Sequence, residues 1–153
     1  MPAPSIAPAS AQDLDDALPL FAGYQRFYTG KARDDAHNRR FLERFLEPSD
    51  AGLLLLARDP ATNEAVGLAN LYWTFSSTTA EEHALMNDLF VADGARGANV
   101  GHALIEAARQ AARDRGLGSL SWQTAVDNRK AQRLYERLDA ERSIWFEYAA
   151  RTG

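Results

Sequence analysis

A short segment rich in glycine and alanine carries the most chemically informative spacing in the sequence. Glycines stand at positions 94, 97 and 101, between a hydrophobic run and a helical stripe of apolar residues. Free backbone N–H groups at the start of a helix bind anions, and small side chains let a phosphate approach the main chain. Arg96 adds a charge that pairs with phosphate oxygens. The spacing predicts a phosphate-binding loop, although a plain strand-to-helix connection has the same composition, and neither the dinucleotide fingerprint nor the P-loop pattern fits it.

A second segment, further along the chain, contains Asn128 and Tyr135 in the order N-x-x-A-x-x-L-Y. This segment resembles the second signature of the GNAT superfamily of N-acetyltransferases, and Arg96–Gly101 resembles that family's pyrophosphate loop, [R/Q]-x-x-G-x-[G/A]. One predicted helix and one predicted strand separate the two segments, as in the family. The chain departs from the family pattern at Asn99, where glycine is usual, and at Asp139-Ala140, where Gly-Phe is usual. Asparagine tolerates positive φ better than other non-glycine residues, so the loop can still form.

The resemblance implies acetyl-CoA as cosubstrate and assigns residues to it. The main-chain groups of Leu89, Phe90 and Val91 would hold the pantetheine arm and polarise the thioester carbonyl. Asn128 resembles the residue that bonds the pantetheine arm, and it is equally suited to cap a helix. The loop residues expected to anchor the diphosphate are Arg96, Gly97, Ala98, Asn99, Val100 and Gly101.

Two residues are candidates for proton transfer. Tyr135 occupies the family's acid position beside the cofactor, and a phenol with an ordinary pKa near 10 is protonated at neutral pH. An alkyl ammonium is only about one part in a thousand neutral at pH 7, so a base such as Asp88 would assist its reaction. Each residue also has a purely structural interpretation. Tyr135 would then pack on a helix face, and Asp88 would be an ion-paired aspartate at a strand edge.

Aromatic side chains gather in the segments that flank the acceptor site in this family. We expect Tyr24, Tyr28 and Trp122 to line a cation-binding cleft, although most aromatic residues of these segments would belong to the core. The strand Leu120–Thr124, the absent Gly-Phe and the closing segment resemble the histone/polyamine-type group of the family. The acceptor would then be a small polyamine, an amino acid or a protein lysine.

Composition narrows the alternatives. The chain has 153 residues, 46% of them hydrophobic and 25% charged, which fits one domain over residues 1–153. It contains no cysteine, which excludes disulfides and thiolate nucleophiles, and its three histidines have no metal-ligand spacing, so no metal site is predicted. The formal net charge of −4 argues against nucleic acid as a partner. No apolar run suits a membrane span and no signal-peptide pattern is present, so we expect a cytoplasmic protein.

The apolar patterning and the resemblance together predict an α/β fold of the mixed α+β kind. The sheet would be splayed, six- to seven-stranded and flanked by about four helices, with a right-handed crossover between parallel strands over residues 85–126. The first helix should kink or end early at Pro19. Glu81, Glu82 and His83 should lie in a loop. Strands are expected over residues 5–9, 52–58, 66–75, 85–91, 120–126 and 144–149, and further helices over 35–46, 100–115 and 130–138.

Two other functions stay open at the level of sequence. A non-catalytic acyl-CoA-binding or regulatory module with the same fold is favoured by Asn99, whereas Tyr135 favours an enzyme. A protein-interaction domain that uses the aromatic surface would need no cofactor. For the enzyme we expect direct attack of the amine on the thioester, because no cysteine is available for a covalent intermediate. A homodimer is expected, because members of the family often dimerise.

Overall fold

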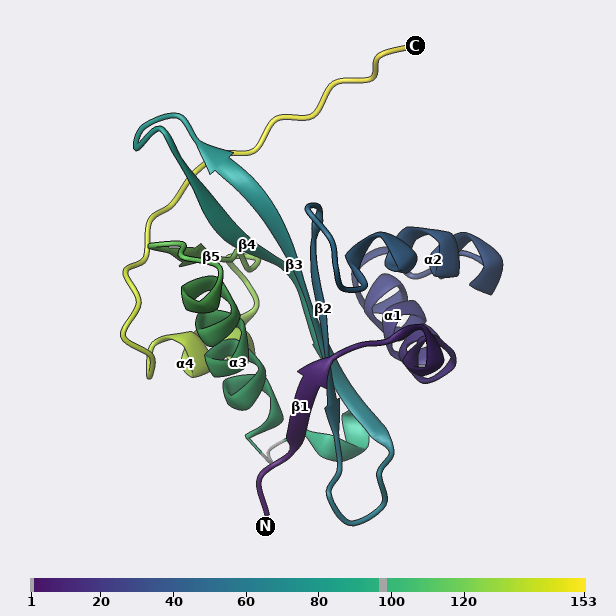
Figure 1. The fold of residues 1–153 in the computed structure, drawn as a ribbon. Coiled ribbons are helices and arrows are strands. Elements are labelled where there is room, and N and C mark those ends of the chain that lie inside the picture. The colour runs from purple at the N-terminus through teal and green to yellow at the C-terminus, as the bar shows by residue number, and fades with distance from the viewer. Residues whose placement is uncertain (1, 97–98) are drawn as a thin grey trace. The chain divides into compact units, whose positions relative to one another are not determined.

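The computed structural model describes residues 2–96 and 99–153 (Figure 1). By its internal contacts the chain divides into two compact units, residues 1–123 and residues 124–153. Among the residues described, the first unit contains a five-stranded sheet and three α-helices, and the second contains one α-helix. Within the described residues, no helix combines the length and apolar character needed to cross a bilayer.

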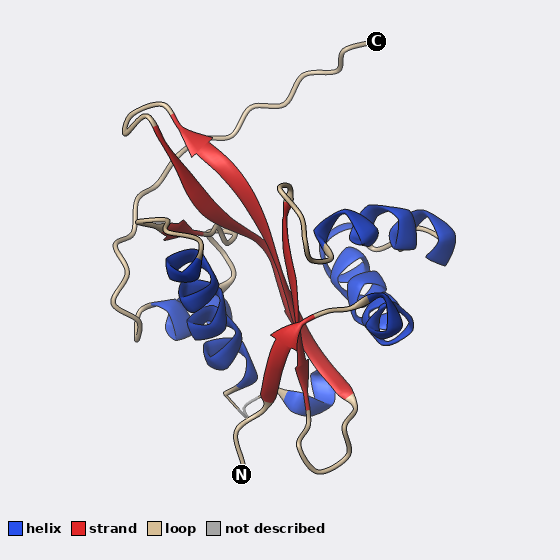
Figure 2. Ribbon diagram, in the orientation of Figure 1, coloured by secondary structure: helices blue, strands red, loops and turns tan. Residues whose placement is uncertain are grey.

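The sheet of the first unit is mixed, with strand order β1-β2-β3-β4-β5 (Figure 2). The first three pairs are antiparallel, and β4 and β5 are parallel because helix α3 (Val100–Asp114) crosses between them. This confirms the predicted crossover. The strands are β1 (Ser5–Pro8), β2 (Gly52–Arg58), β3 (Ala65–Ser76), β4 (Glu81–Val91) and β5 (Leu120–Ser121).

Helices cover both faces of this sheet. Helix α1 (Leu14–Thr29) packs on one face with α2 (Asp35–Leu42) against it, and α3 packs on the other face (Figure 1). Strand β2 is therefore apolar throughout: Leu54 and Leu56 join the core beneath α1, whereas the alternate leucines face α3. Single 3-10 turns precede α1, follow α2 and follow β4, at Ala11–Asp13, Glu43–Phe45 and Asp93–Ala95.

Helix α1 does not end at Pro19, contrary to the sequence-based expectation. It continues to Thr29 and closes on Gly30, which has a left-handed φ of 75°. Proline removes one backbone hydrogen bond and crowds the preceding turn. Burial of Leu18, Phe21 and Ala22 on the sheet outweighs that local loss, because packing of the apolar face supplies most of a helix's stability in a protein.

Strand β4 is longer than predicted. The predicted loop residues Glu81, Glu82 and His83 are its first three residues and pair with the end of β3. Arg115, at the C-cap of α3, donates to Glu82 at 3.0 Å and lies 4.9 Å from the ring centroid of Trp73. Pairing across the hairpin and this ion pair hold a polar segment in a strand that its composition does not favour.

Strands β4 and β5 pair over only two residues each, Ala84–Leu85 with Leu120–Ser121. Strand β5 therefore ends well before the predicted residue 126, and residues 86–91 of β4 have no strand partner on that side among the described residues. The sheet is consequently open beside the second half of β4. This gap is the splay that the predicted fold requires.

The second unit contains α4 (Arg129–Tyr135), which begins at the N-cap residue Asn128. No strand forms over the predicted segment 144–149, and in the described chain the sheet has five strands rather than six to seven. Ile144, Trp145 and Tyr148 are exposed in this segment. A β-favouring sequence needs a neighbouring strand to satisfy its backbone, and pairing of this segment depends on tertiary contacts rather than on its own residues.

Candidate functional site

The segment after β4 begins with a 3-10 turn and leads to α3. Arg96 at its end forms an ion pair with Asp93 at 2.8 Å, and its Nε donates to the Val91 carbonyl oxygen at 3.3 Å. Gly97 and Ala98, both assigned to the phosphate loop, lie outside the described residues. The arginine is thus held at the end of β4 that borders the gap in the sheet.

Asn99 adopts the backbone conformation that its place in the loop predicted. Its φ is 59° and its ψ is 16°, in the left-handed region that favours glycine and next favours asparagine. Its side chain makes no capping hydrogen bond to α3, which begins at Val100. The N–H groups in the first turn of α3, which includes Gly101, thus have no cap from Asn99, and such groups are anion donors.

The open edge of β4 presents main-chain groups from alternate residues. The Ala92 N–H donates to the Val66 carbonyl at 2.9 Å, so the amide of Ala92 points toward β3. Because successive amides along a strand point to opposite edges, those of Leu89 and Val91 point toward the gap and that of Phe90 toward β3. The ring of Phe90 packs against the core under α1.

A buried carboxylate lies on the α1 side of the sheet. Asp88 is 2% exposed and pairs across the strands with Asn70, which is fully buried, next to a β-bulge. Oδ1 of Asp88 accepts from the Asn87 side-chain amide at 2.9 Å. Its Oδ2 has no hydrogen-bond partner in the described parts of the chain, and neither polar atom of the Asn70 side chain has one.

Burial raises the pKa of the Asp88 carboxyl, and the side chains of Tyr24, Asn87 and Asn70 are close enough to oppose that rise without cancelling it. Asn70 exerts this effect although its amide makes no hydrogen bond of normal geometry. A carboxylate whose pKa is raised by desolvation is a stronger proton acceptor than an exposed one. This is the arrangement expected of a general base.

Three tyrosines surround Asp88. Burial and the charge of Asp88 raise the pKa of Tyr24 and Tyr28, and they raise the pKa of Tyr72 to about 12. Tyr24 and Tyr28 lie one turn apart on α1, with ring centroids 4.8 Å apart. All three phenols are therefore neutral at physiological pH. They form an aromatic and polar wall around the carboxylate, and neutral phenols suit an ammonium ligand.

A glycine in the middle of α1 allows this approach. A Cβ added to Gly23 would lie 2.9 Å from the ring of Phe90, closer than real side chains approach. Gly23 lets the helix sit directly on β4, which places the neighbouring Tyr24 beside Asp88. The Tyr24 hydroxyl lies 3.5 Å from the main-chain oxygen of Asn87, to which it donates.

The structure thus brings together Asp88, Tyr24 and Tyr28 from the predicted site residues. Trp122 follows β5 by one residue and is half-buried; its place beside the acceptor stays a prediction. Asn70 and Tyr72 were not predicted. The signal that would have found them is the alternation along β3, which places both on the face that carries Asp88 of the next strand.

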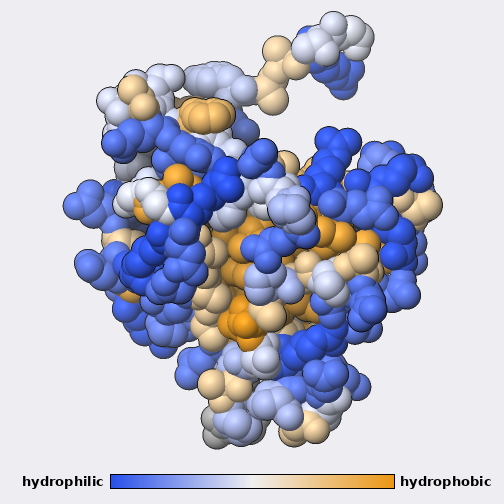
Figure 3. Space-filling model, in the orientation of Figure 1, coloured by the Kyte–Doolittle hydropathy of each residue, from blue (hydrophilic) through white to orange (hydrophobic). Residues whose placement is uncertain are grey.

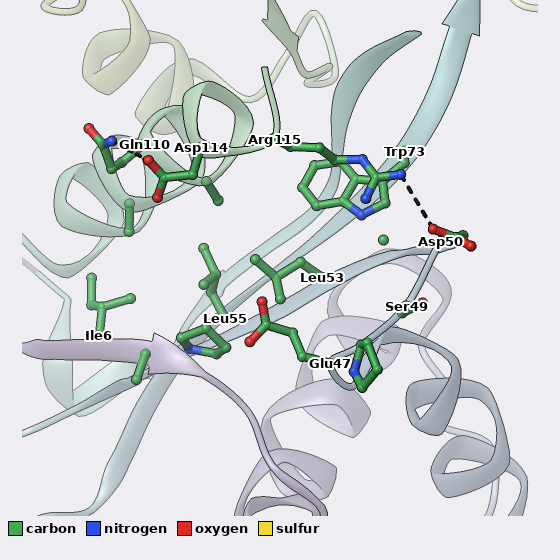
Figure 4. Close-up of a pocket in the computed structure, with 16 residues that line it drawn as sticks. Ile6, Glu47, Ser49, Asp50, Leu53, Leu55, Trp73, Gln110, Asp114 and Arg115 are labelled. Atoms are coloured by element: carbon green, nitrogen blue, oxygen red, sulfur yellow. Dashed lines mark hydrogen bonds and ion pairs between the residues drawn. The ribbon is translucent and has the colours of Figure 1, made fainter. Parts of the chain in front are cut away.

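A cavity of about 610 Å³ lies on the α3 side of the sheet (Figure 4). Apolar side chains gather at the centre of the face that Figure 3 shows, with hydrophilic ones around them. The floor of this cavity includes Ile6, Leu53 and Leu55, and its carboxylates are Glu47, Asp50 and Asp114. These three carboxylates are all exposed. None of the three is buried as Asp88 is on the other side of the sheet.

In the second unit, Asn128 has the capping role that its position allowed. Its side-chain oxygen accepts from the Ala131 N–H at 3.3 Å at the start of α4. Tyr135 is the last residue of this helix. The assignment of Asn128 to the pantetheine arm and of Tyr135 to proton donation remain predictions.

A mixed sheet that opens beside β4, a connection from β4 into the crossing helix α3 and a buried carboxylate on β4 are together typical of the acyl-CoA-dependent transferase class. Residues 17–140 match the acetyltransferase (GNAT) family. The chain is 34% identical over 142 residues to the uncharacterized N-acetyltransferase YhfO of Bacillus subtilis (strain 168), with 93% of each chain covered. A solved structure of a probable acetyltransferase superposes with a TM-score of 0.83, at 30% identity, covering 97% of this chain and 98% of that one.

A further relative is the D-amino-acid N-acetyltransferase HPA3 of Saccharomyces cerevisiae (strain ATCC 204508 / S288c). It is 36% identical over 95 residues, which cover 62% of this chain and 59% of the yeast protein. The chain belongs to the GNAT family of acetyltransferases. It is an N-acetyltransferase, and the family implies acetyl-CoA as the acetyl donor and an amine as the acceptor.

Proposed function

We propose that this enzyme acetylates the primary amine of an amino acid, with Asp88 as general base and Tyr135 as general acid. The observation that carries the proposal is the buried Asp88 carboxylate beneath the aromatic side chains of α1, whose pKa is raised and whose Oδ2 has no hydrogen-bond partner among the described residues. The sequence leaves three classes of acceptor open, namely polyamines, amino acids and protein lysines, and two observations favour amino acids.

The proposed reaction is a direct transfer. Acetyl-CoA would supply the acetyl group as a thioester, with its diphosphate on the Arg96–Gly101 loop and its pantetheine arm along Leu89, Val91 and Asn128. Asp88 accepts a proton from the substrate ammonium, and the freed amine nitrogen forms the new bond to the carbonyl carbon. As the carbon–sulfur bond breaks, Tyr135 donates its phenolic proton to the departing thiolate, and the nitrogen loses its second proton to solvent as the amide forms. Solvent then returns a proton to Tyr135 and takes the one held by Asp88, so that each turnover releases one proton. Main-chain N–H groups at the open edge of β4 stabilise the charge on the carbonyl oxygen.

The first feature that favours an amino acid is a pair of cations in the connection between α1 and α2, where the carboxylate of Asp34 is engaged in capping α2 by accepting from the His37 N–H at 2.9 Å. Lys31 and Arg33 lie in this connection, just beyond the turn of α1 that carries Tyr28. The Arg33 N–H donates to the Gln25 side chain at 2.9 Å, which ties the connection back to α1. A zwitterion fits this pattern, because its ammonium would meet Asp88 while its carboxylate meets the cations.

The second feature is the yeast relative, whose name assigns it D-amino acids. A polyamine would also bring an ammonium to Asp88, but its second ammonium would meet Lys31 and Arg33 unfavourably. The resemblance to the histone/polyamine-type group therefore does not decide the acceptor, and the two cations of the α1–α2 connection favour an amino acid over a polyamine.

A panel of matched acceptors tests this proposal. We expect thiol release from acetyl-CoA with L- and D-amino acids, and at least about tenfold lower kcat/KM with the corresponding amino acid amides, which lack the carboxylate. In an Arg33→Gln/Lys31→Gln double variant, KM should rise for the amino acids and not for their amides. The ratio of kcat/KM between acids and amides should therefore become smaller. Faster turnover of spermidine or of a lysine peptide than of every amino acid would reject the proposed acceptor class and leave the acetyl transfer itself standing.

Replacement of Arg96 by glutamine should weaken acetyl-CoA binding. We expect Kd for acetyl-CoA to rise about tenfold, because a charge-assisted contact to phosphate is worth roughly 1.5–3 kcal/mol. Titration calorimetry measures this directly. Arg113→Gln on the exposed side of α3 is the matched control and should bind like the wild type; equal affinities for both variants would remove Arg96 from the site.

Replacement of Asn99 by glycine should improve the loop. Glycine adopts a φ of 59° without the steric cost that a side chain carries there, and it clears space next to the diphosphate. We expect Kd for acetyl-CoA to fall about threefold and Tm to stay the same or rise. Asn99→Ala should have the opposite effect on Tm, because alanine in this conformation is strained. A weaker-binding Asn99→Gly variant would mean that the asparagine side chain itself contacts the cofactor.

We also propose that the protein acts in the cytoplasm and that it forms a homodimer, as members of this family often do. Light scattering coupled to gel filtration measures the mass in solution. A monomeric mass at micromolar concentration would reject the dimer without affecting the proposed chemistry.

A further inference from the structure

We propose that Asn70 is a positioning residue for acetyl transfer, whose side-chain amide orients the carboxylate of Asp88 toward the acceptor amine. The inference rests on the proposed function for the role of Asp88. It concerns a residue to which neither the family motifs nor the sequence patterns assign a role.

Asn70 is an unusual residue for its place in the sheet. It lies in the middle of β3, is fully buried, and neither its Oδ1 nor its Nδ2 has a hydrogen-bond partner in the described chain. Its neighbours on the same face of β3 are Leu68, which is in the core, and Tyr72. A buried amide without partners destabilises a fold, and native proteins rarely keep one unless a functional site needs it. Leucine has nearly the same size and shape, so packing alone does not explain the asparagine.

The position of Asn70 relative to Asp88 suggests that the functional site requires its amide. The two residues are direct partners in the register of β3 and β4, so their side chains project from the same face at neighbouring positions. Asn87 already holds Oδ1 of Asp88, and Oδ2 is the oxygen left without a partner. The register shift directly after Asn70 leaves Asn87 as an extra residue on β4. A bulge of this kind re-aims side chains, and here it adjoins the pair.

The other groups that face Asp88 come from different positions, and Tyr24 and Asn87 favour its charged form as Asn70 does. Tyr24 and Tyr28 come from α1 and Tyr72 comes from β3, and all three interact with the Asp88 charge as neutral phenols. Asn70 contributes an amide donor that does not ionise, placed on the strand beside the carboxylate. Its effect on Asp88 opposes the effect of burial, because a donor near the carboxylate favours the charged form. Asn70 therefore favours the ionised form of the base in an apolar layer.

The test compares two buried asparagines with different surroundings. Asn38 is also fully buried, but its amide exchanges two hydrogen bonds of 2.9 Å with Gln25. Asn38→Leu removes a satisfied amide and should lower Tm by several degrees, about 2–4 °C for each kcal/mol lost in a chain of this size. It should leave the acidic limb of the pH–kcat/KM profile where it is. Asn70→Leu should keep Tm at the wild-type value or above.

Activity and its pH dependence separate positioning from structure. We expect Asn70→Leu to lower kcat/KM for the amine about tenfold or more, with KM for acetyl-CoA unchanged, and to move the acidic limb to higher pH. Asn70→Asp, which has the same shape, should move that limb further, because a second carboxylate beside Asp88 disfavours its charged form. The pH of the acidic limb should therefore increase from the wild type to Asn70→Leu and then to Asn70→Asp.

Two results would overturn the inference in different ways. If Asn70→Leu loses Tm as Asn38→Leu does and its acidic limb stays in place, Asn70 has a structural role only, and Asp88 can still be the base. If Asp88→Asn retains wild-type activity, the proposed base is wrong and the positioning role falls with it. The first result leaves the proposed function intact, and the second rejects both.

Discussion

Replacing Asp88 by asparagine is expected to lower kcat/KM for the acceptor amine by about 100-fold or more. The substitution keeps the shape of the side chain and removes its ability to accept a proton. At neutral pH the unaided enzyme would depend on the roughly one-thousandth of an alkyl amine that is already neutral. Calorimetric titration with acetyl-CoA should give an unchanged Kd, because Asp88 faces α1 rather than the gap beside β4.

The same variant should be more stable than the wild type at neutral pH. The direction of the Asp88 pKa shift determines how this difference in stability changes with pH. Burial raises the pKa of Asp88 above its value in the unfolded chain, so the folded state binds the proton more tightly. The stabilisation from protonated Asp88 is fully present below the unfolded pKa of about 3.9 and is lost as pH rises through the raised folded pKa. Asp88→Asn should therefore raise Tm at pH 7 and lose this advantage near pH 3.5.

A matched control separates this effect from a general change in charge. Asp50 has a fully exposed side chain, so Asp50→Asn should change neither Tm nor kcat/KM measurably. A wild-type rate for Asp88→Asn at pH 7 would exclude Asp88 as the base. A fall in its Tm would mean that the buried carboxylate stabilises the fold, contrary to the direction of its pKa shift.

Replacing Tyr135 by phenylalanine is expected to lower kcat by about 100-fold, with little change in the Kd for acetyl-CoA. The phenyl ring preserves packing at the end of α4, and only the proton donor is removed. Without it, the thiolate must leave unprotonated or take its proton from water. A rapid-quench measurement of a single turnover reports the chemical step separately from product release.

Tyr148 provides the control for this variant within the same unit. It is 92% exposed, and Tyr148→Phe should retain the wild-type kcat. A second check changes the leaving group and keeps the acceptor the same. A thioester whose thiol has a lower pKa needs less protonation as it leaves, so it should restore part of the rate of Tyr135→Phe. Equal losses with strong and weak leaving groups would argue that Tyr135 positions the cofactor and is not the acid.

The order of the elements and the crossover were predictable because they depend on local signals. Pro48 and the turn residues between 59 and 64 mark ends of segments, and the leucines of β2 identify a strand buried on both faces. The spacing from Arg96 to Gly101 predicted a helix start, which the structure places at Val100, and Asn99 has the positive φ expected at that position. In each case the property belongs to a few neighbouring residues and their allowed backbone angles.

Three features depended on contacts between distant segments and could not be predicted locally. Helix α1 continues through Pro19 because its apolar face packs on the sheet, and Glu82 joins β4 because it meets Arg115 from the end of α3. The segment around Trp145 has a strand-like composition, yet it forms no strand in the described chain. Pairing of strands depends on a partner edge, which no stretch of sequence contains by itself.

The sequence by itself determined that this chain is a GNAT-type acetyltransferase, because its two motifs stand in the order and spacing typical of the family. Only the tertiary structure decided the surroundings of Asp88, since its burial, its unpaired oxygen and its neighbour Asn70 arise from the register of β3 and β4 and from the approach of α1 at Gly23. The physical reason is that desolvation and cross-strand contact are properties of three-dimensional packing. A carboxylate in a strand acquires the character of a base only when that packing excludes water from it.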